Sequence, residues 1–252
     1  MLKKRIIPLL LLQGDRLIKT LNFDKFRDVG NPVSTSKIYN DSDADEIILL
    51  NISKNKRNSS DMISILEKIS ENCFIPISAG GGINSLNDTI ELIKSGADKI
   101  VVNSICYKNY NLINTISSKC GRQAVVASID VKKINDKYVL FSNCGRERED
   151  ISLEDHIKKL IDNDVGEILI NSIDCEGTMN GPDENLIAKV CNISTVPVIS
   201  SGGIGNYDHI KNIFKNTNSS AVACGSLFNF TDSNPIRIKS YLKSYDINLR
   251  LF

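Results

Sequence analysis

The chain has 252 residues, of which 41% are hydrophobic and 24% are charged, proportions that are ordinary for a globular protein with a full core. Its 31 basic residues nearly balance its 30 acidic ones, which argues against a nucleic-acid-binding protein. Seven cysteines form no Cys-x-x-Cys pair and only two histidines are present, so we expect free thiols in a reducing cytoplasm, no metal site and no cofactor.

The longest apolar run, residues 6–12, is too short to span a membrane, and no cleavage-site pattern follows it. It predicts a strand rather than a signal peptide. Seven further short runs, mostly rich in Ile and Val, are typical of strands buried on both faces. In chain order the predicted strands are residues 5–12, 46–52, 75–79, 99–103, 124–131, 167–171, 196–200 and 221–224.

Helical patterns separate these strands, and the spacing of Ser85 with Asp88 and of Ser152 with Asp155 resembles a capping box at two helix starts. The predicted helices are residues 33–40, 61–71, 86–95, 109–119, 153–163, 184–191, 207–215 and 236–244. Eight strands that alternate with eight helices predict an α/β protein, a single (β/α)8 TIM barrel over residues 1–252. An open doubly wound sheet is the alternative.

An internal repeat favours the barrel. Glu-Ile-Ile-Leu-Leu-Asn at residues 46–51 recurs as Glu-Ile-Leu-Ile-Asn at residues 167–171, and Gly-Gly-Ile at residues 81–83 recurs at residues 202–204. Each second copy starts 121 positions after the first. This period predicts two half-barrels of four βα units each.

Residues 131–142 predict a hairpin that turns at Asn135 and Asp136. The charged segment that follows, residues 143–151, comes after the fifth predicted strand, on the face where barrel enzymes carry their active sites. A mobile loop over the site and a solvated charged loop are equally compatible with its composition.

Glycine-rich or Ser-containing turns follow the third, fourth, seventh and eighth predicted strands. Their candidate phosphate-binding residues are Gly81, Gly82, Asn103, Ser104, Gly202, Gly203, Gly225 and Ser226. Glycines let backbone N–H groups approach an anion closely. We therefore predict one phosphate site in each half-barrel, suited to a small ligand with a phosphate at each end. The alternative is a pair of tight turns of which the first is vestigial.

Four predicted strands begin with a charged residue, at Arg5, Glu46, Lys99 and Glu167. Strand starts lie on the barrel face opposite the active site. Two cations and two anions there predict a neutral ring of salt bridges that closes the barrel floor, which by itself is a structural feature.

Asp130 ends the fifth predicted strand, where a carboxylate faces the active-site mouth and is a candidate general acid or base. A capping or salt-bridged aspartate is the alternative. The equivalent place in the first half-barrel falls within residues 8–13, which contain no carboxylate. Symmetric two-carboxylate chemistry is therefore not available.

Segments along the whole chain carry a family resemblance. They are residues 1–8, 79–83, 97–99, 102–104, 172–174, 201–203, 241–242 and 248–250, together with Asp183. These segments resemble the cyclase subunit of imidazole glycerol phosphate synthase, the HisF family, which is a lyase and a TIM barrel.

The resemblance implies a partner, a glutaminase subunit (HisH) that docks on the barrel floor and whose ammonia passes through the barrel. It makes the ring of four charges an ammonia gate and Asp98 a glutaminase contact. It also adds Lys19 and Gly177 to the phosphate-binding residues, and it makes Asp130 one of two catalytic aspartates.

Leu11 stands where the family has its other catalytic aspartate. Loss of a positioned general acid typically costs about 100- to 10,000-fold in rate. The remaining departures are Glu176 for an aspartate, Asn171 for a threonine, Cys144 for a serine and Asn229 for a histidine. Residues 9–13 resemble a HisF-like subgroup found in bacterial surface-polysaccharide clusters.

Two functions stay open from the sequence. One is a specialised paralogue with impaired cyclase activity that conducts ammonia to a third enzyme, which amidates a surface sugar. The other is a functional cyclase of histidine biosynthesis, in which a nearby group such as Asp15 compensates for Leu11. A phosphosugar isomerase on the same scaffold is disfavoured. The sister isomerase of histidine synthesis also needs two carboxylates, and Leu11 stands in place of one of them. Neither reading involves a membrane.

Overall fold

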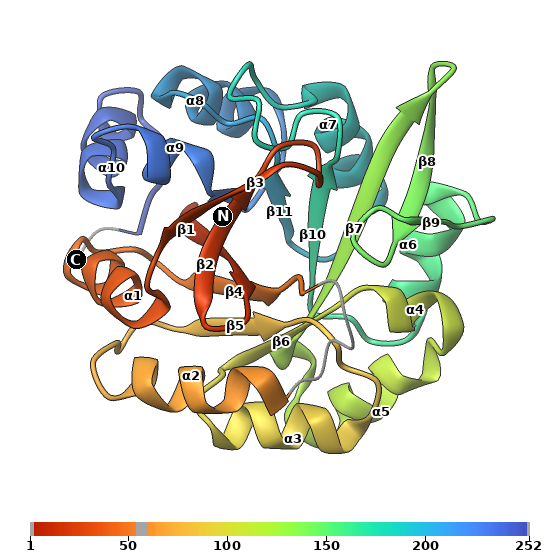
Figure 1. Ribbon diagram of the computed structural model, residues 1–252. Helices are drawn as coiled ribbons and strands as arrows, with labels where there is room; N and C mark the ends of the chain where they lie inside the picture. Colours follow the sequence, from red (N-terminus) through yellow and green to blue (C-terminus); the bar gives the residue numbers. More distant parts are fainter. Residues whose placement is uncertain (1–2, 54–59, 251–252) are drawn as a thin grey trace.

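A computed structural model of the chain describes residues 3–53 and 60–250. Eight parallel strands form a closed ring at the centre (Figure 1). They are β1 (Arg5–Gln13), β4 (Ile47–Asn51), β5 (Ile77–Gly80), β6 (Lys99–Val102), β7 (Val125–Ile134), β10 (Glu167–Ser172), β11 (Val198–Ser201) and β12 (Ala221–Cys224). Because β7 pairs with β10 and β12 pairs with β1, the ring is continuous. The predicted (β/α)8 barrel is confirmed, and the open sheet is ruled out.

Helices surround the ring (Figure 1). They are α1 (Pro32–Asp41), α2 (Ser60–Ser70), α3 (Leu86–Lys94), α4 (Ser104–Lys108), α5 (Asn111–Cys120), η1 (Arg122–Ala124), α6 (Leu153–Asp162), α7 (Glu184–Ile193), α8 (Tyr207–Asn216), α9 (Ser226–Phe230) and α10 (Pro235–Lys243). The capping box of Ser85 and Asp88 is present in both directions, and Ser152 accepts a hydrogen bond from the Asp155 N–H. These caps satisfy N–H groups that the first helical turn leaves unpaired.

The order of the strands agrees with the internal repeat. β1, β4, β5 and β6 are neighbours in the ring, and β7, β10, β11 and β12 make up the rest. Each half is therefore continuous both in sequence and in space. The proposed N-terminal motif includes Met1 and Leu2, and the predicted domain runs to residue 252; these ends lie outside the described residues.

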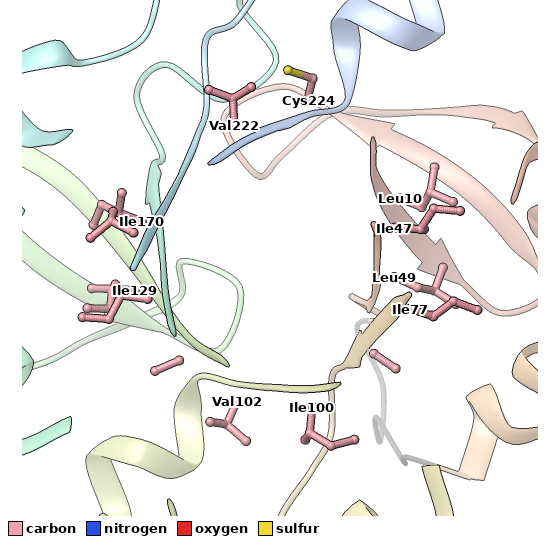
Figure 2. Packing of buried hydrophobic residues seen from close by; sticks show 14 of the residues in the cluster. Leu10, Ile47, Leu49, Ile77, Ile100, Val102, Ile129, Ile170, Val222 and Cys224 are labelled. Atoms are coloured by element: carbon pink, nitrogen blue, oxygen red, sulfur yellow. The ribbon is translucent and has the colours of Figure 1, made fainter. Parts of the chain in front are cut away.

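The strands are apolar along their length because they bury side chains on both faces. On β4, Ile48 faces the barrel interior, whereas Ile47 and Leu49 belong to the layer between strands and helices. Figure 2 shows members of this outer layer pointing away from the ring of strands. The inner layer contains Ile7, Ile48, Val101, Val126, Leu169, Ile199, Ala221 and Ala223.

Two antiparallel hairpins extend the barrel at its carboxyl end. The predicted hairpin is confirmed: β7 continues through Asn135 and Asp136, both with positive φ, into β8 (Lys137–Ser142). The second hairpin, β2 (Arg16–Thr20) and β3 (Phe26–Gly30), pairs with β1 and was not predicted. The pattern gave no signal because three residues of β3 are exposed and its apolar residues do not alternate.

Some predicted boundaries were wrong. The strands predicted at residues 75–79 and 196–200 begin at Ile77 and Val198, directly after Pro76 and Pro197. Proline has no N–H to donate to a ladder, so the pairing starts beyond it. The helix predicted at residues 109–119 is preceded by a separate short helix, α4. The two-residue strand β9 (Glu147–Arg148) lies in the charged segment and pairs with β8.

No helix within residues 3–53 and 60–250 is long and apolar enough to cross a membrane. In the same ranges, no group of three or more His, Cys, Asp or Glu side chains is arranged to hold a metal ion. The seven cysteines, all of which fall in the described part of the chain, are free thiols.

Candidate functional site

A cavity of about 380 Å³ opens at the carboxyl ends of the strands, the face on which barrel enzymes bind their substrates. Side chains of β1, β4, β6, β7 and β10 line it, together with the β2–β3 hairpin and four residues of the charged segment, Asn143, Cys144, Arg146 and Glu147. The charged segment therefore lies at the rim of this mouth. Among the predicted site residues, the cavity brings together Gly81, Gly82, Asn103, Ser104 and Asp130.

Two amide side chains fix the carboxylate of Asp130, which is 7% exposed. Asn103 Nδ2 donates to Asp130 Oδ2 over 2.8 Å, and Asn171 Nδ2 donates to Asp130 Oδ1 over 3.4 Å. Asn171 is the register partner of Asp130 on β10, and Asn103 follows β6 on the other side of β7. The carboxylate is thus held at the mouth, where it could exchange a proton with a bound ligand.

Leu11 lies on β1 in the wall of the same cavity. It is 8% exposed, and its register partners are Leu50 on β4 and Ile18 on β2. An aliphatic side chain cannot transfer a proton. Asp15 lies in the exposed turn between β1 and β2, and it lines neither this cavity nor the smaller pocket beside it. Its position therefore does not support a role for its carboxylate in place of the aspartate that is missing at Leu11.

A second, smaller pocket adjoins the mouth and shares Leu11 and Glu176 with it. It brings together the remaining predicted phosphate-binding residues, Lys19, Gly177, Gly202, Gly203, Gly225 and Ser226. Gly202 and Gly203 have φ values of 94° and 83°, a region that favours glycine. The Ser226 hydroxyl is buried without a hydrogen-bond partner. Glycine turns and an unpaired hydroxyl beside a lysine suit an anionic ligand.

The charge in this pocket is an ion pair between Lys19 and Glu176, both buried. Thr20 Oγ1 donates to the other carboxylate oxygen of Glu176 over 2.9 Å. Burial lowers the pKa of Lys19 to about 8. Glu176 already supplies Lys19 with an anion, so a phosphate group that enters this pocket competes with a carboxylate for the same ammonium.

The first-half turn also departs from ordinary backbone geometry. Gly81 has φ 111°, and a Cβ on it would lie 2.2 Å from the carbonyl oxygen of Asn51. Only glycine fits there. After β6, Ser104 Oγ accepts a hydrogen bond from the Asn143 N–H over 3.0 Å, which joins the start of α4 to the charged segment.

The predicted ring of charges is closed at the opposite end of the barrel. Arg5 contacts Glu46 at 2.8 Å and Glu167 at 2.7 Å. Lys99 contacts the same two carboxylates at 2.8 and 3.0 Å, so each cation bridges both anions. Burial by itself would raise the pKa of Glu167. The positive charges of Arg5 and Lys99, and the hydrogen bonds that they donate, outweigh burial, so the pKa of Glu167 is lowered.

The floor has further polar contacts around the ring. Ser78 Oγ donates to Glu46 Oε1 over 2.5 Å, so Glu46 is bonded to three groups although it is only 2% exposed. Asp98 is exposed on this face, and its Oδ2 accepts from the Ile77 N–H over 2.8 Å. The position of Asp98 is compatible with contact to another protein.

Sequence reasoning did not assign a site role to three side chains that line the mouth. Glu176 and Asn171 were noted only as departures from the resembling family, and Asn51 was noted only as part of the repeat. Asn51 ends the first copy of the repeated strand motif, residues 46–51, and Asn171 ends the second, residues 167–171. The repeat therefore contained a signal for both amides.

Known proteins are similar to this chain over its full length. Residues 5–233 match a family model described as "Histidine biosynthesis protein". Curated proteins named "Imidazole glycerol phosphate synthase subunit HisF" are 36% identical in Natranaerobius thermophilus, 37% in Bacillus cereus strain Q1 and 38% in Clostridium botulinum. Each alignment covers 100% of both chains. The chain therefore belongs to the HisF family of histidine biosynthesis proteins.

Proposed function

We propose that the chain is the HisF-type subunit of a glutamine amidotransferase complex and receives ammonia from a HisH-type glutaminase docked on the barrel floor. The observation that carries this proposal is the closed ring of Arg5, Glu46, Lys99 and Glu167, opposite the ligand-binding mouth. The name of the relatives, a synthase subunit, supports a partner protein. Asp98 is the proposed contact on the same face.

The barrel interior supports transfer of a neutral molecule. Between the ring and the mouth, the inner layer contains a cluster of aliphatic side chains. An ion loses its hydration in such surroundings at a far greater cost than a neutral molecule does. Ammonia therefore crosses the barrel uncharged, and the charged ring separates the glutaminase side from the interior.

We further propose that this chain is a specialised paralogue with impaired cyclase chemistry. Ring closure and cleavage need proton transfer at two places. The mouth offers Asp130 on β7, whereas Leu11 occupies the place on β1 where the family has its other catalytic aspartate. A missing general acid typically costs about 100- to 10,000-fold in rate. The pocket around Lys19 and Ser226 would still hold a small phosphorylated ligand.

The acceptor of the ammonia in this proposal is the substrate of a third enzyme, which amidates a surface sugar. The similarity of residues 9–13 to second-copy paralogues of surface-polysaccharide, including lipopolysaccharide, biosynthesis supports this setting.

A functional cyclase of histidine biosynthesis is the second candidate. The oriented carboxylate of Asp130 and the glycine turns of both half-barrels favour it. So does the shared name of the relatives. In this case the ammonia reacts in the mouth of the same barrel.

The deciding experiment measures cyclase turnover of the purified chain with excess ammonium and the ribotide substrate, beside a Leu11→Asp variant. The paralogue proposal expects no turnover by the unchanged chain and measurable turnover by Leu11→Asp. Turnover by the unchanged chain within about tenfold of an ordinary enzyme rate would instead establish the cyclase. Glutamine-dependent ammonia release in a complex with a HisH-type subunit, reduced by Asp98→Lys, tests the partner separately.

A further inference from the structure

The smaller pocket beside the mouth, which Lys19, Gly202, Gly203 and Ser226 help to line, is nearly closed. We call it the second-half pocket. Its volume is about 20 Å³, which is room for about one water molecule, whereas a phosphate group carries four oxygens around its phosphorus. The buried hydroxyl of Ser226 is covered in this conformation. A phosphate group therefore enters the second-half pocket only if part of its wall moves.

The glycine side of this wall is closely packed against other backbone. The Gly181 N–H donates to the Gly203 carbonyl oxygen over 2.9 Å, and a Cβ on Gly203 would lie 2.1 Å from the Gly181 carbonyl oxygen. A Cβ on Gly202 would lie 2.9 Å from the Ser172 carbonyl oxygen. Backbone segments that approach so closely leave little room for displacement. The side that can move is the one that the side chains of Lys19 and Glu176 form.

Glu176 receives donors that a bound phosphate would use. Its carboxylate accepts from the Lys19 ammonium, from the Thr20 hydroxyl over 2.9 Å and from the Phe23 N–H over 3.4 Å. All three donors belong to the β2–β3 hairpin and its turn. Cationic side chains, hydroxyls and backbone N–H groups are also the usual donors to phosphate in proteins. Glu176 thus takes the place of an anionic ligand on the hairpin.

The pocket has no second cation to offer. Of the described residues that line it, Lys19 is the only cation and Glu176 the only anion. A phosphate that binds Lys19 therefore leaves the carboxylate of Glu176 buried without its counter-charge, which is costly. If Glu176 stays in place instead, two anions meet at one buried ammonium and repel each other.

We propose that Glu176 is a specificity-determining residue, a built-in anion that a ligand phosphate must displace from Lys19 in order to bind in the second-half pocket. This inference rests on the proposed function, which places a phosphorylated ligand beside this pocket. Displacement of Glu176 lowers the affinity of the pocket for phosphate. The barrel thereby favours ligands whose end at the second-half pocket carries no phosphate.

The test is a titration of the isotope-labelled full chain with sodium phosphate, which replaces sodium chloride at constant ionic strength and pH 7. The backbone amide NMR signals of Gly203 and Ser226 report binding in the second-half pocket. Glu176→Gln keeps the shape of the side chain and removes its charge, so the half-saturating phosphate concentration should fall about tenfold or more. A variant that merely damages the pocket would bind phosphate more weakly, not more tightly.

Two further variants identify the cause of the gain. Lys19→Met in the Glu176→Gln chain should abolish the gain, because it removes the ammonium that Glu176→Gln releases. Glu176→Asp shortens the side chain by one methylene and draws the carboxylate back from Lys19. It should raise the phosphate affinity about threefold or more, and it serves where the glutamine variant does not fold.

Asp174 provides a matched control for charge. It is exposed, lies two residues before Glu176, and its Oδ2 accepts from the Lys133 N–H over 2.7 Å. Asp174→Asn removes the same charge without freeing Lys19, so the phosphate affinity should stay within about twofold of that of the unchanged chain.

Three results would overturn the inference. Glu176→Gln could bind phosphate no more tightly than the unchanged chain, which would show that Glu176 is not a competitor. An equal gain in Asp174→Asn would reveal a general effect of charge. A gain that survives Lys19→Met would place the phosphate elsewhere. None of these results depends on the glutaminase or on cyclase turnover, so the outcome is distinct from that of the proposed function.

Discussion

Lys19 and Glu176 form a buried ion pair between β2 and the segment that follows β10, 157 positions apart in the sequence. Around this pair, the Asn22 N–H donates to the carbonyl oxygen of Glu176 over 2.9 Å. Gly177 approaches so closely that a Cβ on it would lie 2.3 Å from the Thr20 carbonyl oxygen. The ion pair therefore fastens the β2–β3 hairpin to the second half-barrel, beside the proposed phosphate pocket.

Replacement of Glu176 by glutamine should lower the free energy of unfolding by about 3 kcal/mol, because it leaves the buried ammonium of Lys19 without its anion. Glutamine has almost the same shape, so packing changes little. Urea-induced unfolding at pH 7 measures the difference.

A matched control lies in the same hairpin. Arg16 and Asp28 form an ion pair at 2.8 Å, but their side chains are 49% and 52% exposed. Asp28→Asn should therefore leave the midpoint of urea unfolding almost unchanged, because exposed ion pairs contribute little to stability. Similar losses in both variants would show that burial does not set the strength of these pairs.

The lowered pKa of Lys19 predicts a pH dependence of stability. Its pKa is about 8 in the folded chain, against an ordinary value of 10.5. Between these values the unfolded chain binds more protons at Lys19 than the folded chain does, so stability rises with pH there. Below pH 8, the cost of burying the charged ammonium of Lys19 is fully present and lowers the free energy of unfolding by about 3 kcal/mol.

The measurement compares the unchanged chain with a Lys19→Met, Glu176→Gln double variant, which has neither charge. From pH 8 to pH 10, the unfolding free energy of the unchanged chain should rise relative to that of the double variant. Parallel curves over that range would contradict the assigned pKa.

The ring at the barrel floor should be a sensitive point for folding. Glu46 is 2% exposed and bonds to Arg5, Lys99 and Ser78. Glu46→Gln leaves two partly buried cations with one carboxylate between them, and we expect a loss of about 3–5 kcal/mol in unfolding free energy.

Glu154→Gln is the comparison for this variant. Glu154 pairs with Lys189 at 2.6 Å, but the two side chains are 49% and 42% exposed. A loss below about 1 kcal/mol is expected. Thermal or urea unfolding of both variants decides the point, and a small loss for Glu46→Gln would mean that the ring adds little to stability.

The eight barrel strands could be predicted because each is buried on both faces and reads as a short apolar run. The ring of charges could be placed as well, since Arg5, Glu46, Lys99 and Glu167 stand at or beside strand starts, and strand starts share one end of a barrel. What the sequence could not supply was which cation meets which anion. In the structure, each cation contacts both carboxylates.

The mouth was less predictable, for two physical reasons. The partners of Asp130 depend on the register of β6, β7 and β10, and register is set by packing of whole strands. The burial of Lys19 depends on Glu176 and on a hairpin without a clear pattern. The roles of Asp130, of the phosphate-binding residues and of Asp98 stay predictions, although the structure places them at the expected ends of the barrel.

His156 should make the protein lose stability in mild acid. Its ring is completely buried, stacks on Tyr107 with centroids 4.2 Å apart, and lies 2.7 Å from the Tyr110 hydroxyl through Nδ1. Burial, with a smaller contribution from the charge of Lys159, lowers the pKa of His156 from 6.5 to about 4. Between these values the unfolded chain binds the additional proton, so stability falls as the pH drops from 6.5 to 4, by about 3 kcal/mol in total.

His156→Phe keeps the aromatic stack but cannot take up a proton, so its unfolding free energy should vary less over this range. Equal slopes for the unchanged chain and His156→Phe would show that other groups govern its acid sensitivity.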